Sequence, residues 1–236
     1  MEPAERGGHA LHLLVVNGNT SEAMTETLRR AVGPMLPAGV TAEVRGVARG
    51  PRYIGTPEEV VEAAAAIEEE FAVILSEADG SRYSAAVLAC FGEPGLGAVR
   101  KICPFPVTGM AEASAHAAMQ LGADFAVATL GERWPAMLRD LYRNVGLDER
   151  CRAIATVPGQ VRTLQEDPRM ADRVFEVVED LAHRVDPAAI VIGGAALVGV
   201  AAAIQHRIDT PLIDSFSAAL GQAIALACTA PRCSPM

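Results

Sequence analysis

Short apolar runs alternate with longer amphipathic or alanine-rich stretches along nearly the whole chain. The apolar runs predict buried strands at 12–16, 40–47, 85–89, from 107, 125–130, 152–157, 190–192 and 211–213. The stretches between them predict helices at 22–33, 57–71, 96–102, 111–121, 132–145, 168–183, 196–206 and 215–228. Strands that alternate with helices in this way are typical of parallel sheets joined by right-handed crossovers. We therefore expect an α/β fold whose chemistry lies at the carboxyl ends of the strands.

The second half of the chain resembles the first half, which indicates an internal repeat. Three pairs of segments align at offsets of 104, 105 and 112: Ala86–Cys90 with Ile190–Gly194, Pro106–Thr108 with Pro211–Ile213, and Leu13–Asn17 with Phe125–Thr129. A chain that repeats itself once predicts two pseudo-symmetric lobes, each a mostly parallel sheet flanked by helices, with an active site in the cleft between them. One lobe then brings the thiol of Cys90 to this cleft, and the other brings Gly194 at the matching place.

The repeat also predicts how the chain divides between the lobes. We expect the first lobe to comprise residues 11–108 plus 209–228, and the second lobe to comprise 109–208. The two ends, 1–10 and 229–236, are expected to be flexible.

Composition narrows the class of protein. The chain has 236 residues and a net charge of −9, which argues against a nucleic-acid partner. No uncharged apolar run reaches the length of a membrane span, and the first residues lack the features of a signal peptide. Its five cysteines are scattered and lack metal-ligand spacing, so we expect reduced thiols, no metal and a cytoplasmic location. Homo-oligomerisation is compatible with the sequence.

Cys90 is the strongest candidate for chemistry, because it follows a predicted buried strand and precedes the loop Gly92–Gly95. A thiol near the start of a helix is stabilised as thiolate, so we expect its pKa to be lowered into a range useful for a base. The alternative is a small buried hydrophobic residue. Gly193 and Gly194 can bring backbone N–H groups to a carboxylate or an enolate, or simply form a tight turn.

Several polar residues at predicted strand ends are candidates for substrate binding. Their amide, hydroxyl or carboxylate groups suit a small polar substrate, although ordinary helix capping explains the first three equally well. They are Asn17, Asn19, Thr20, Thr129 and Asp214. Glu112 and His116 lie one turn apart on a predicted helix, where a solvated or core position is the simpler interpretation. No nucleotide-binding or zinc motif is present, so no cofactor is expected.

Three segments resemble the hydantoin racemase branch of the aspartate/glutamate/hydantoin racemase superfamily. The run Asn17–Ser21, with Met24-Thr25 after it, resembles the branch's Asn-Pro-Asn-Ser/Thr…Met-Thr opening, with glycine in place of proline. The run Ala89–Leu96 is similar to its Ala-Cys-Phe-Asp/Gly-Asp-Pro-Gly-Leu signature, and Pro211–Asp214 is similar to its Pro-Val-Ile-Asp segment. The resemblance extends over nearly the whole chain, from about 12 to 227.

This resemblance implies a cofactor-independent enzyme in which two cysteines flank the stereocentre of the substrate. Cys90 matches the first cysteine, and Phe91 beside it joins the candidate substrate-binding residues. The second cysteine is expected within Gly-Cys-Ala-Gly-Met, where this chain has Gly193, Gly194, Ala195, Ala196 and Leu197. The departure falls on the second catalytic residue, and Ala195 remains a candidate for substrate binding.

The function expected from the resemblance is proton transfer at a carbon next to a carbonyl, with Cys90 as a single catalytic thiol. The substrate is expected to be an amino acid, a hydantoin or a related small carboxylate. One alternative is a one-cysteine decarboxylase, because the arylmalonate decarboxylase branch also works with one cysteine, on the other lobe. Another is a catalytically degenerate member of the family that binds a metabolite without turnover.

Overall fold

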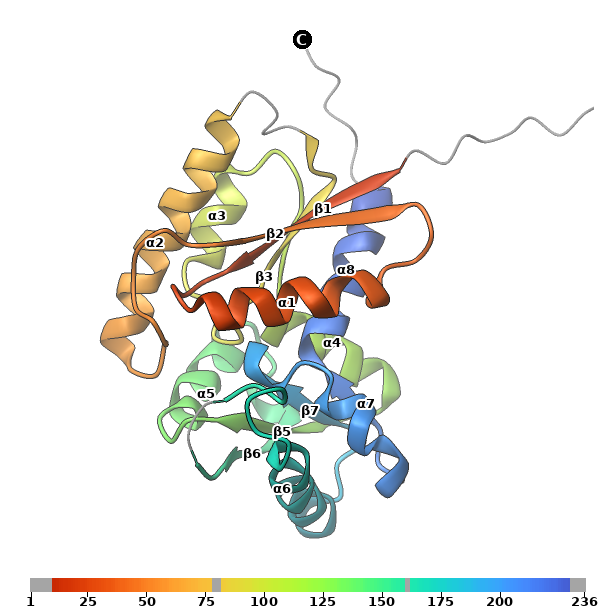
Figure 1. The fold of residues 1–236 in the computed structure, drawn as a ribbon. Helices are drawn as coiled ribbons and strands as arrows, with labels where there is room; N and C mark the ends of the chain where they lie inside the picture. Colours follow the sequence, from red (N-terminus) through yellow and green to blue (C-terminus); the bar gives the residue numbers. More distant parts are fainter. Residues whose placement is uncertain (1–9, 78–81, 160–161, 230–236) are drawn as a thin grey trace, which may run out of the picture.

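The chain forms two lobes, one above the other in Figure 1, in a computed structural model that describes residues 10–77, 82–159 and 162–229. The first lobe holds a parallel sheet of β1 (Leu11–Asn17), β2 (Val40–Gly46), β3 (Ala85–Leu88) and β4 (Val107–Gly109). The second holds a parallel sheet of β5 (Phe125–Leu130), β6 (Cys151–Val157), β7 (Ile190–Gly193) and β8 (Leu212–Asp214). Most of the two ends expected to be flexible lies outside the described residues.

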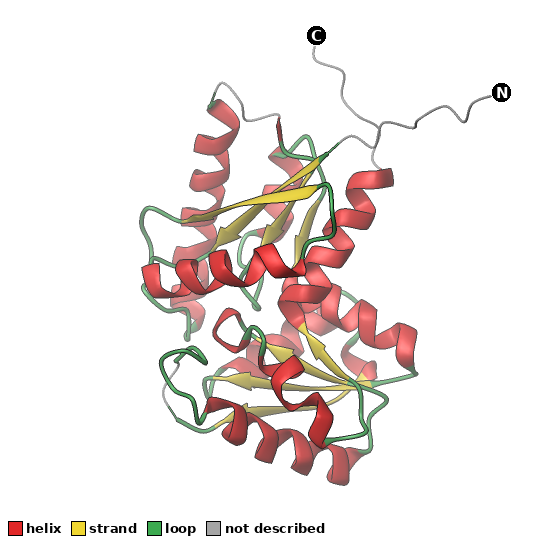
Figure 2. Ribbon diagram, turned by 45° about the vertical axis from the view of Figure 1, so that its right-hand side comes forward, coloured by secondary structure: helices red, strands yellow, loops and turns green. Residues whose placement is uncertain are grey.

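Helices cover both faces of each sheet (Figure 2). The α-helices are α1 (Glu22–Met35), α2 (Pro57–Ser76), α3 (Leu96–Ile102), α4 (Met110–Leu121), α5 (Trp134–Asn144), α6 (Met170–Val185), α7 (Val200–Ile204) and α8 (Ser215–Thr229). The described residues also form the short 3-10 helices η2 (Asp148–Arg150), η3 (Ala195–Leu197) and η4 (Gln205–Arg207). None of the helices formed by the described residues is long and apolar enough to cross a membrane.

The two sheets have the same strand order and the same register, which confirms the predicted two-lobed repeat. The orders are β2-β1-β3-β4 and β6-β5-β7-β8. In the first sheet Leu14 pairs with Ala86, and in the second their counterparts Ala126 and Ile190 pair with each other. Because all strands of a sheet run in the same direction, the loops that follow them meet at one edge. This edge of each lobe faces the other lobe.

Two helices cross between the lobes. The helix α4 follows β4 of the first sheet but packs against β7 and β8 of the second, and α8 follows β8 but packs against β3 and β4. The two helices also pack against each other, so they join the lobes (Figure 1). Residues 209–228 were expected to belong to the first lobe, but this expectation holds only for α8. The strand β8 pairs with β7 in the second sheet, whereas α8 packs on the first sheet.

Local sequence signals explain where helices begin and where one expected helix fails. Thr56 forms a capping box with Glu59 at the start of α2, and Ser21 caps α1 by accepting the N–H of Met24. The helix expected over 196–206 is interrupted instead. Gly199 lies between η3 and α7 at a φ of +86°, a left-handed conformation that does not continue a helix.

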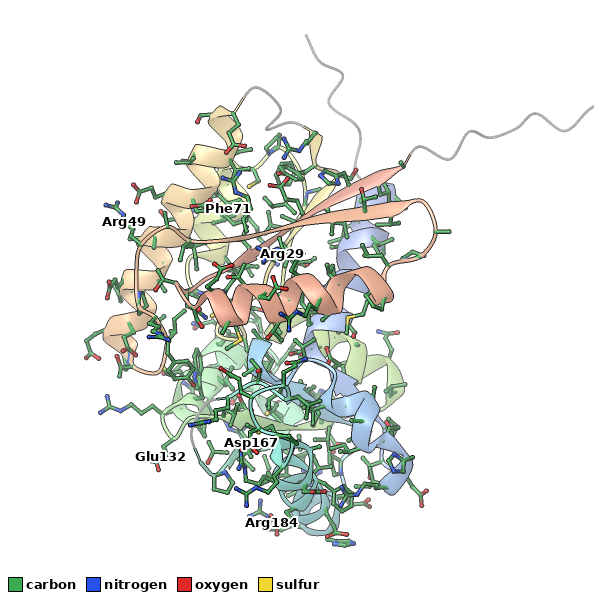
Figure 3. All side chains as sticks on the ribbon, viewed as in Figure 1. Arg29, Arg49, Phe71, Glu132, Asp167 and Arg184 are labelled. Atoms are coloured by element: carbon green, nitrogen blue, oxygen red, sulfur yellow. The ribbon has the colours of Figure 1, made fainter. Side chains whose placement is uncertain are left out.

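The packing between sheets and helices is apolar, and its largest fully buried side chains are aromatic. Phe71 lies on the inner face of α2 and is fully buried, whereas Arg49 and Arg184 lie at the periphery of the molecule (Figure 3). Alanines on α4, among them Ala111, Ala115 and Ala118, are fully buried. Such small side chains let α4 pack closely between the two lobes, which keeps the edges of the sheets facing each other.

Candidate active site

A small pocket of about 60 Å³ lies between the lobes at the carboxyl ends of the strands. Its lining comes from the ends of β5 and β7 and from the loops or helices after β1, β2, β3, β5 and β7. These residues are Asn19, Met24, Tyr53, Ile54, Ala89, Cys90, Phe91, Thr129, Leu130, Trp134, Gly193, Gly194, Ala195 and Ala196. None of these residues carries a charged side chain. Among the described residues no three His, Cys, Asp or Glu side chains gather closely enough to hold a metal ion. The pocket therefore suits a small and largely neutral molecule.

Cys90 lies two residues beyond β3, with only 7% of its surface exposed. Burial raises the pKa of its thiol to about 11, and the backbone N–H groups of Gly92 and Glu93 act in the opposite direction. The expectation of a lowered pKa was wrong. The desolvation of a thiolate at this depth outweighs the two N–H groups that face it. A thiol with this pKa is seldom ionised at neutral pH, but its thiolate is a strong base.

Gly194 lies in the second lobe on the same pocket as Cys90, at the place that the internal repeat assigns to it. Its φ is +128°, a conformation that residues with a side chain rarely adopt. No atom lies within 4 Å of the position where a Cβ would stand, so the space beside Gly194 is open. Its N–H donates to Ser215 Oγ at 3.3 Å. The first lobe thus brings a thiol to the pocket, and the second lobe has no side chain at the matching position.

The two lobes contact each other through two aromatic rings that pack on glycines. The ring of Phe91, from the Cys90 loop, occupies the space that a side chain on Gly193 would need. In return, the indole of Trp134 in the second lobe occupies the space beside Gly92 in the first. These reciprocal contacts explain why glycine stands at both positions, and they form two walls of the pocket.

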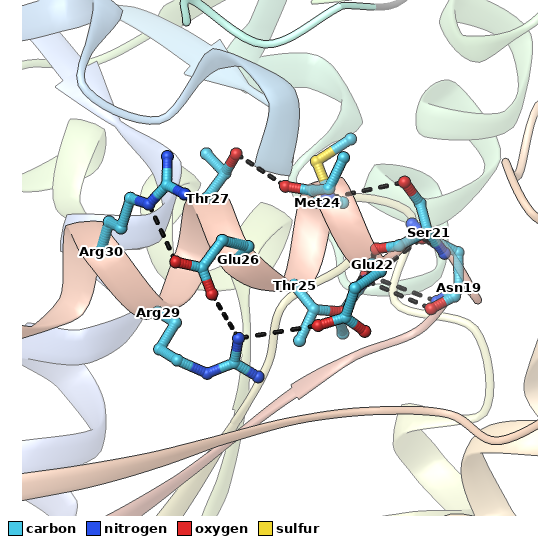
Figure 4. Close-up of polar contacts among 11 residues, drawn as sticks. Asn19, Ser21, Glu22, Met24, Thr25, Glu26, Thr27, Arg29 and Arg30 are labelled. Atoms are coloured by element: carbon cyan, nitrogen blue, oxygen red, sulfur yellow. Dashed lines mark hydrogen bonds and ion pairs between the residues drawn. The ribbon is translucent and has the colours of Figure 1, made fainter.

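Asn17 and Asn19 play different parts in the structure. Asn17 is fully buried outside the pocket lining, and its Nδ2 donates to the carbonyl and Oδ1 of Asn19 and to Thr25 Oγ1. Asn19 lines the pocket, and its Oδ1 also accepts the N–H of Ser21 at 2.9 Å (Figure 4). Because the oxygen of Asn19 is occupied, its Nδ2 group remains for a ligand. Asn17 thus orients Asn19.

Of the other predicted substrate-binding residues, some line the pocket and others do not. Thr129, Phe91 and Ala195 line the pocket, and Thr129 Oγ1 donates to the carbonyl of Gly193 at 2.8 Å. Thr20 and Asp214 are not among the lining residues. The carboxylate of Asp214 accepts the N–H groups of Gly199, Phe216 and Ser217, so it holds the loop after β7 against the start of α8.

Tyr53 and Trp134 line the pocket but were not predicted from the sequence. The indole N–H of Trp134 donates to the hydroxyl of Tyr53, and burial raises the pKa of Tyr53. Since indole nitrogen only donates, the hydroxyl proton of Tyr53 remains for another acceptor. Both residues lie in segments that follow predicted strands. The expectation that chemistry lies at the carboxyl ends of strands could therefore have identified them.

The fold and the pocket define a class of protein: two-lobed α/β enzymes that place a thiol from one lobe opposite the other lobe. The sequence profile of the Asp/Glu/Hydantoin racemase family matches residues 13–223, and the chain belongs to this family. A hydantoin racemase of Paenarthrobacter aurescens is 32% identical over 211 residues, which cover 89% of this chain and 88% of that protein.

Solved structures agree with this assignment. The allantoin racemase of Klebsiella pneumoniae superposes with a TM-score of 0.86 at 27% identity and covers 93% of this chain and 88% of its own. The allantoin racemase of Pseudomonas fluorescens superposes with a TM-score of 0.84 at 24% identity, covering 96% of this chain and 99% of its own. The chain is therefore a racemase-like isomerase.

Proposed function

We propose that this isomerase acts on a neutral cyclic ureide of the hydantoin type and moves a proton at the carbon next to a carbonyl, with Cys90 as its single catalytic thiol. The observation that carries the proposal is the pocket, which places Cys90 among side chains without charge. An amino-acid zwitterion or a carboxylate would lose its hydration there without gaining an ion pair, whereas a hydantoin needs only hydrogen bonds. The identity with a hydantoin racemase supports the same substrate class.

The polar groups of the pocket suit the charge that develops in this reaction. Removal of the proton leaves an enolate oxygen, and its stabilisation by preorganised donors is a large part of catalysis. Asn19 and Tyr53 each have a donor group that their contacts within the protein leave free. Cys90, as thiolate, takes the proton from one face of the ring. Its high pKa makes this thiolate scarce but strongly basic.

The opposite face of the substrate meets the open space beside Gly194. Glycine has no group that takes or gives a proton, so water is the proton source that this space admits. We propose that proton exchange is fast on the face of Cys90 and slow on the face of Gly194.

The substrate class is tested by a panel assayed in deuterated water. We expect exchange of the proton on the carbon between the ring nitrogen and the carbonyl in 5-substituted hydantoins, mainly in one enantiomer. Free amino acids with the same side chains should exchange at least about a hundredfold more slowly, because their charges are not compensated in the pocket. Proton NMR and chiral chromatography measure both rates. Equal rates for the amino acids would contradict the proposal of a neutral substrate.

A second function, decarboxylation, is favoured by the absence of a side chain at Gly194, although its malonate substrate would bring carboxylates into the uncharged pocket. Loss of carbon dioxide from a disubstituted malonate leaves an enediolate that needs only one protonation, and Cys90 alone provides it. Release of carbon dioxide from an arylmalonate, with no exchange into any hydantoin, would favour this function over the first.

Tyr53 gives a further test of the pocket. Tyr53→Phe removes the hydroxyl but keeps the ring, so the walls of the pocket stay in place. We expect kcat to fall by about tenfold to a hundredfold, because one donor to the enolate oxygen is lost in a buried site. Steady-state kinetics on the best hydantoin measure this change. A fall in kcat/KM that comes from KM alone would mean that Tyr53 binds substrate and transition state equally.

We also place the enzyme in the cytoplasm. The four described cysteines, Cys90, Cys103, Cys151 and Cys228, are free thiols. Free thiols are typical of reducing compartments, which supports this proposal.

A further inference from the structure

Glu93 is a buried carboxyl group directly behind the thiol of Cys90. Only 8% of its surface is exposed, and its Oε1 accepts the N–H of Glu112 at 2.8 Å. The N–H of Ala111 also faces this carboxyl group. Glu93 therefore ties the Cys90 loop to the start of α4, the helix that crosses between the lobes. Gly109 makes room for it, because a side chain at Gly109 would overlap the carboxyl group.

The backbone of the same residue is strained. Glu93 has a φ of +53° and is followed by Pro94, a combination that a residue with a side chain adopts only when its surroundings hold it. In this conformation the N–H of Glu93 donates to the carbonyl of Cys90 at 3.0 Å. Together with the N–H of Gly92 it also acts on the thiol of Cys90 and lowers its pKa. Strained residues beside an active site commonly serve it.

The second lobe contains a matching tie. Asp214 accepts the N–H groups of Phe216 and Ser217 at 3.0 and 2.9 Å, and these two residues correspond to Ala111 and Glu112 at the repeat offset of 105. Its other oxygen accepts the N–H of Gly199 in the loop after β7, at 2.8 Å. Each lobe thus uses one carboxyl group to fasten its active-site loop to an inter-lobe helix, but only the carboxyl group of Glu93 lies behind a thiol.

We propose that Glu93 is a positioning residue for Cys90: it holds the Gly92 and Glu93 N–H groups against the thiol, and its ionisation makes the reactivity of that thiol depend on pH. The proposal rests on the proposed catalytic role of Cys90. It is nevertheless testable without a substrate, because alkylation reports on the thiol directly.

The charges around Glu93 set the direction of the effect. Burial raises the pKa of Glu93 to about 8, and the neighbouring Glu112 acts in the same direction. Arg100, on α3, lowers it and pairs with Glu112 at 2.7 Å. Asp140 of α5 borders the same surface hollow, and Tyr142 of α5 interacts with Glu93 electrostatically. Ionised Glu93 in turn raises the pKa of the Cys90 thiol.

The experiment measures alkylation of Cys90 by iodoacetamide in the full chain, with the modified peptide quantified by mass spectrometry from pH 6 to 10. In the native protein the rate should rise about tenfold per pH unit and flatten near pH 8, because ionised Glu93 opposes the thiolate. In Glu93→Gln the flattening should disappear, and the rate above pH 8 should exceed the native rate severalfold. The amide oxygen still accepts the α4 N–H groups, so the alkylation rate below pH 8, where Glu93 itself is uncharged, should stay close to the native rate.

Glu93→Ala separates positioning from charge. Without the tie to α4, the N–H groups of residues 92 and 93 no longer face the thiol. The alkylation rate should fall severalfold at every pH, and kcat should fall about tenfold with little change in KM. Native alkylation and native kcat in a folded Glu93→Ala protein would overturn the proposal.

Two flanking variants test the ionisation even if Glu93→Ala does not fold. Glu112→Gln removes a negative neighbour and should move the flattening to lower pH. Arg100→Gln removes a positive neighbour and should move it to higher pH. A flattening that stays in place in both variants, or that persists in Glu93→Gln, would overturn the role of Glu93 ionisation. Exchange activity that survives Cys90→Ser would instead overturn the proposed function.

Discussion

Cys90→Ser is expected to lower kcat for hydantoin exchange by about three orders of magnitude, which is the usual contribution of a positioned acid or base. The serine hydroxyl fits the same space, so the loop and the pocket stay as they are. Its proton, however, is far less acidic than that of a thiol, and burial at this site opposes ionisation further. Deuterium exchange followed by NMR measures the loss.

The exposed Cys228, on α8, provides the matched control. Cys228→Ser makes the same chemical change away from the pocket and should keep native activity. The native enzyme should also gain activity with rising pH toward about 11, since only the thiolate removes a proton and the pKa of Cys90 is raised. Near pH 8 this gain should slow, where ionisation of Glu93 opposes the thiolate. A folded Cys90→Ser protein with native turnover would contradict the assignment of the catalytic residue.

The sequence predicted the fold well because its signals are local or repeated. Each buried strand is a short apolar run, and the repeat that aligns Ala86–Cys90 with Ile190–Gly194 becomes the shared register of the two sheets. The exchange of α4 and α8 between lobes was only half predicted. An apolar helix such as α8 can pack on either sheet, so the sequence did not show that β8 and α8 belong to different lobes. Both were predicted in the first lobe, whereas β8 pairs with β7 in the second.

The site was predicted only in part, for a different reason. The position of Cys90 follows from the strand before it, but its pKa depends on how deeply the other lobe buries it. Likewise, Asn17 and Asn19 look alike as strand-end amides. Only the hydrogen bonds show that Asn17 orients its neighbour and that Asn19 faces the pocket. Tyr53 comes close to Trp134 through the meeting of two lobes, which no local pattern reports.

The surroundings of Gly193 and Gly194 likewise could not be predicted from the sequence. In the sequence, Gly193 and Gly194 are an indistinguishable pair. In the structure the first makes room for Phe91 across the cleft, whereas the second leaves open space on the substrate side. Only the second position is able to accept a new group without displacing the opposite lobe.

Gly194→Cys is therefore expected to convert one-sided exchange into racemisation. The new thiol would enter open space across the pocket from Cys90, where it would return a proton to the opposite face of the substrate. The φ of +128° opposes the change, and a residue with a side chain there costs on the order of 1–3 kcal/mol of stability. We expect the exchange rates of the two enantiomers, unequal by at least about tenfold in the native enzyme, to approach each other.

The matched control is Gly194→Ala, which introduces the same backbone strain without a thiol. It should lower the melting temperature as much as Gly194→Cys does and bring no gain in exchange on the second face. A gain in both variants would mean that the backbone, not the thiol, limits the second proton transfer. If the native enzyme already exchanges both enantiomers of a hydantoin at equal rates, and Gly194→Cys adds nothing, another residue supplies the second base and the single-thiol proposal is wrong.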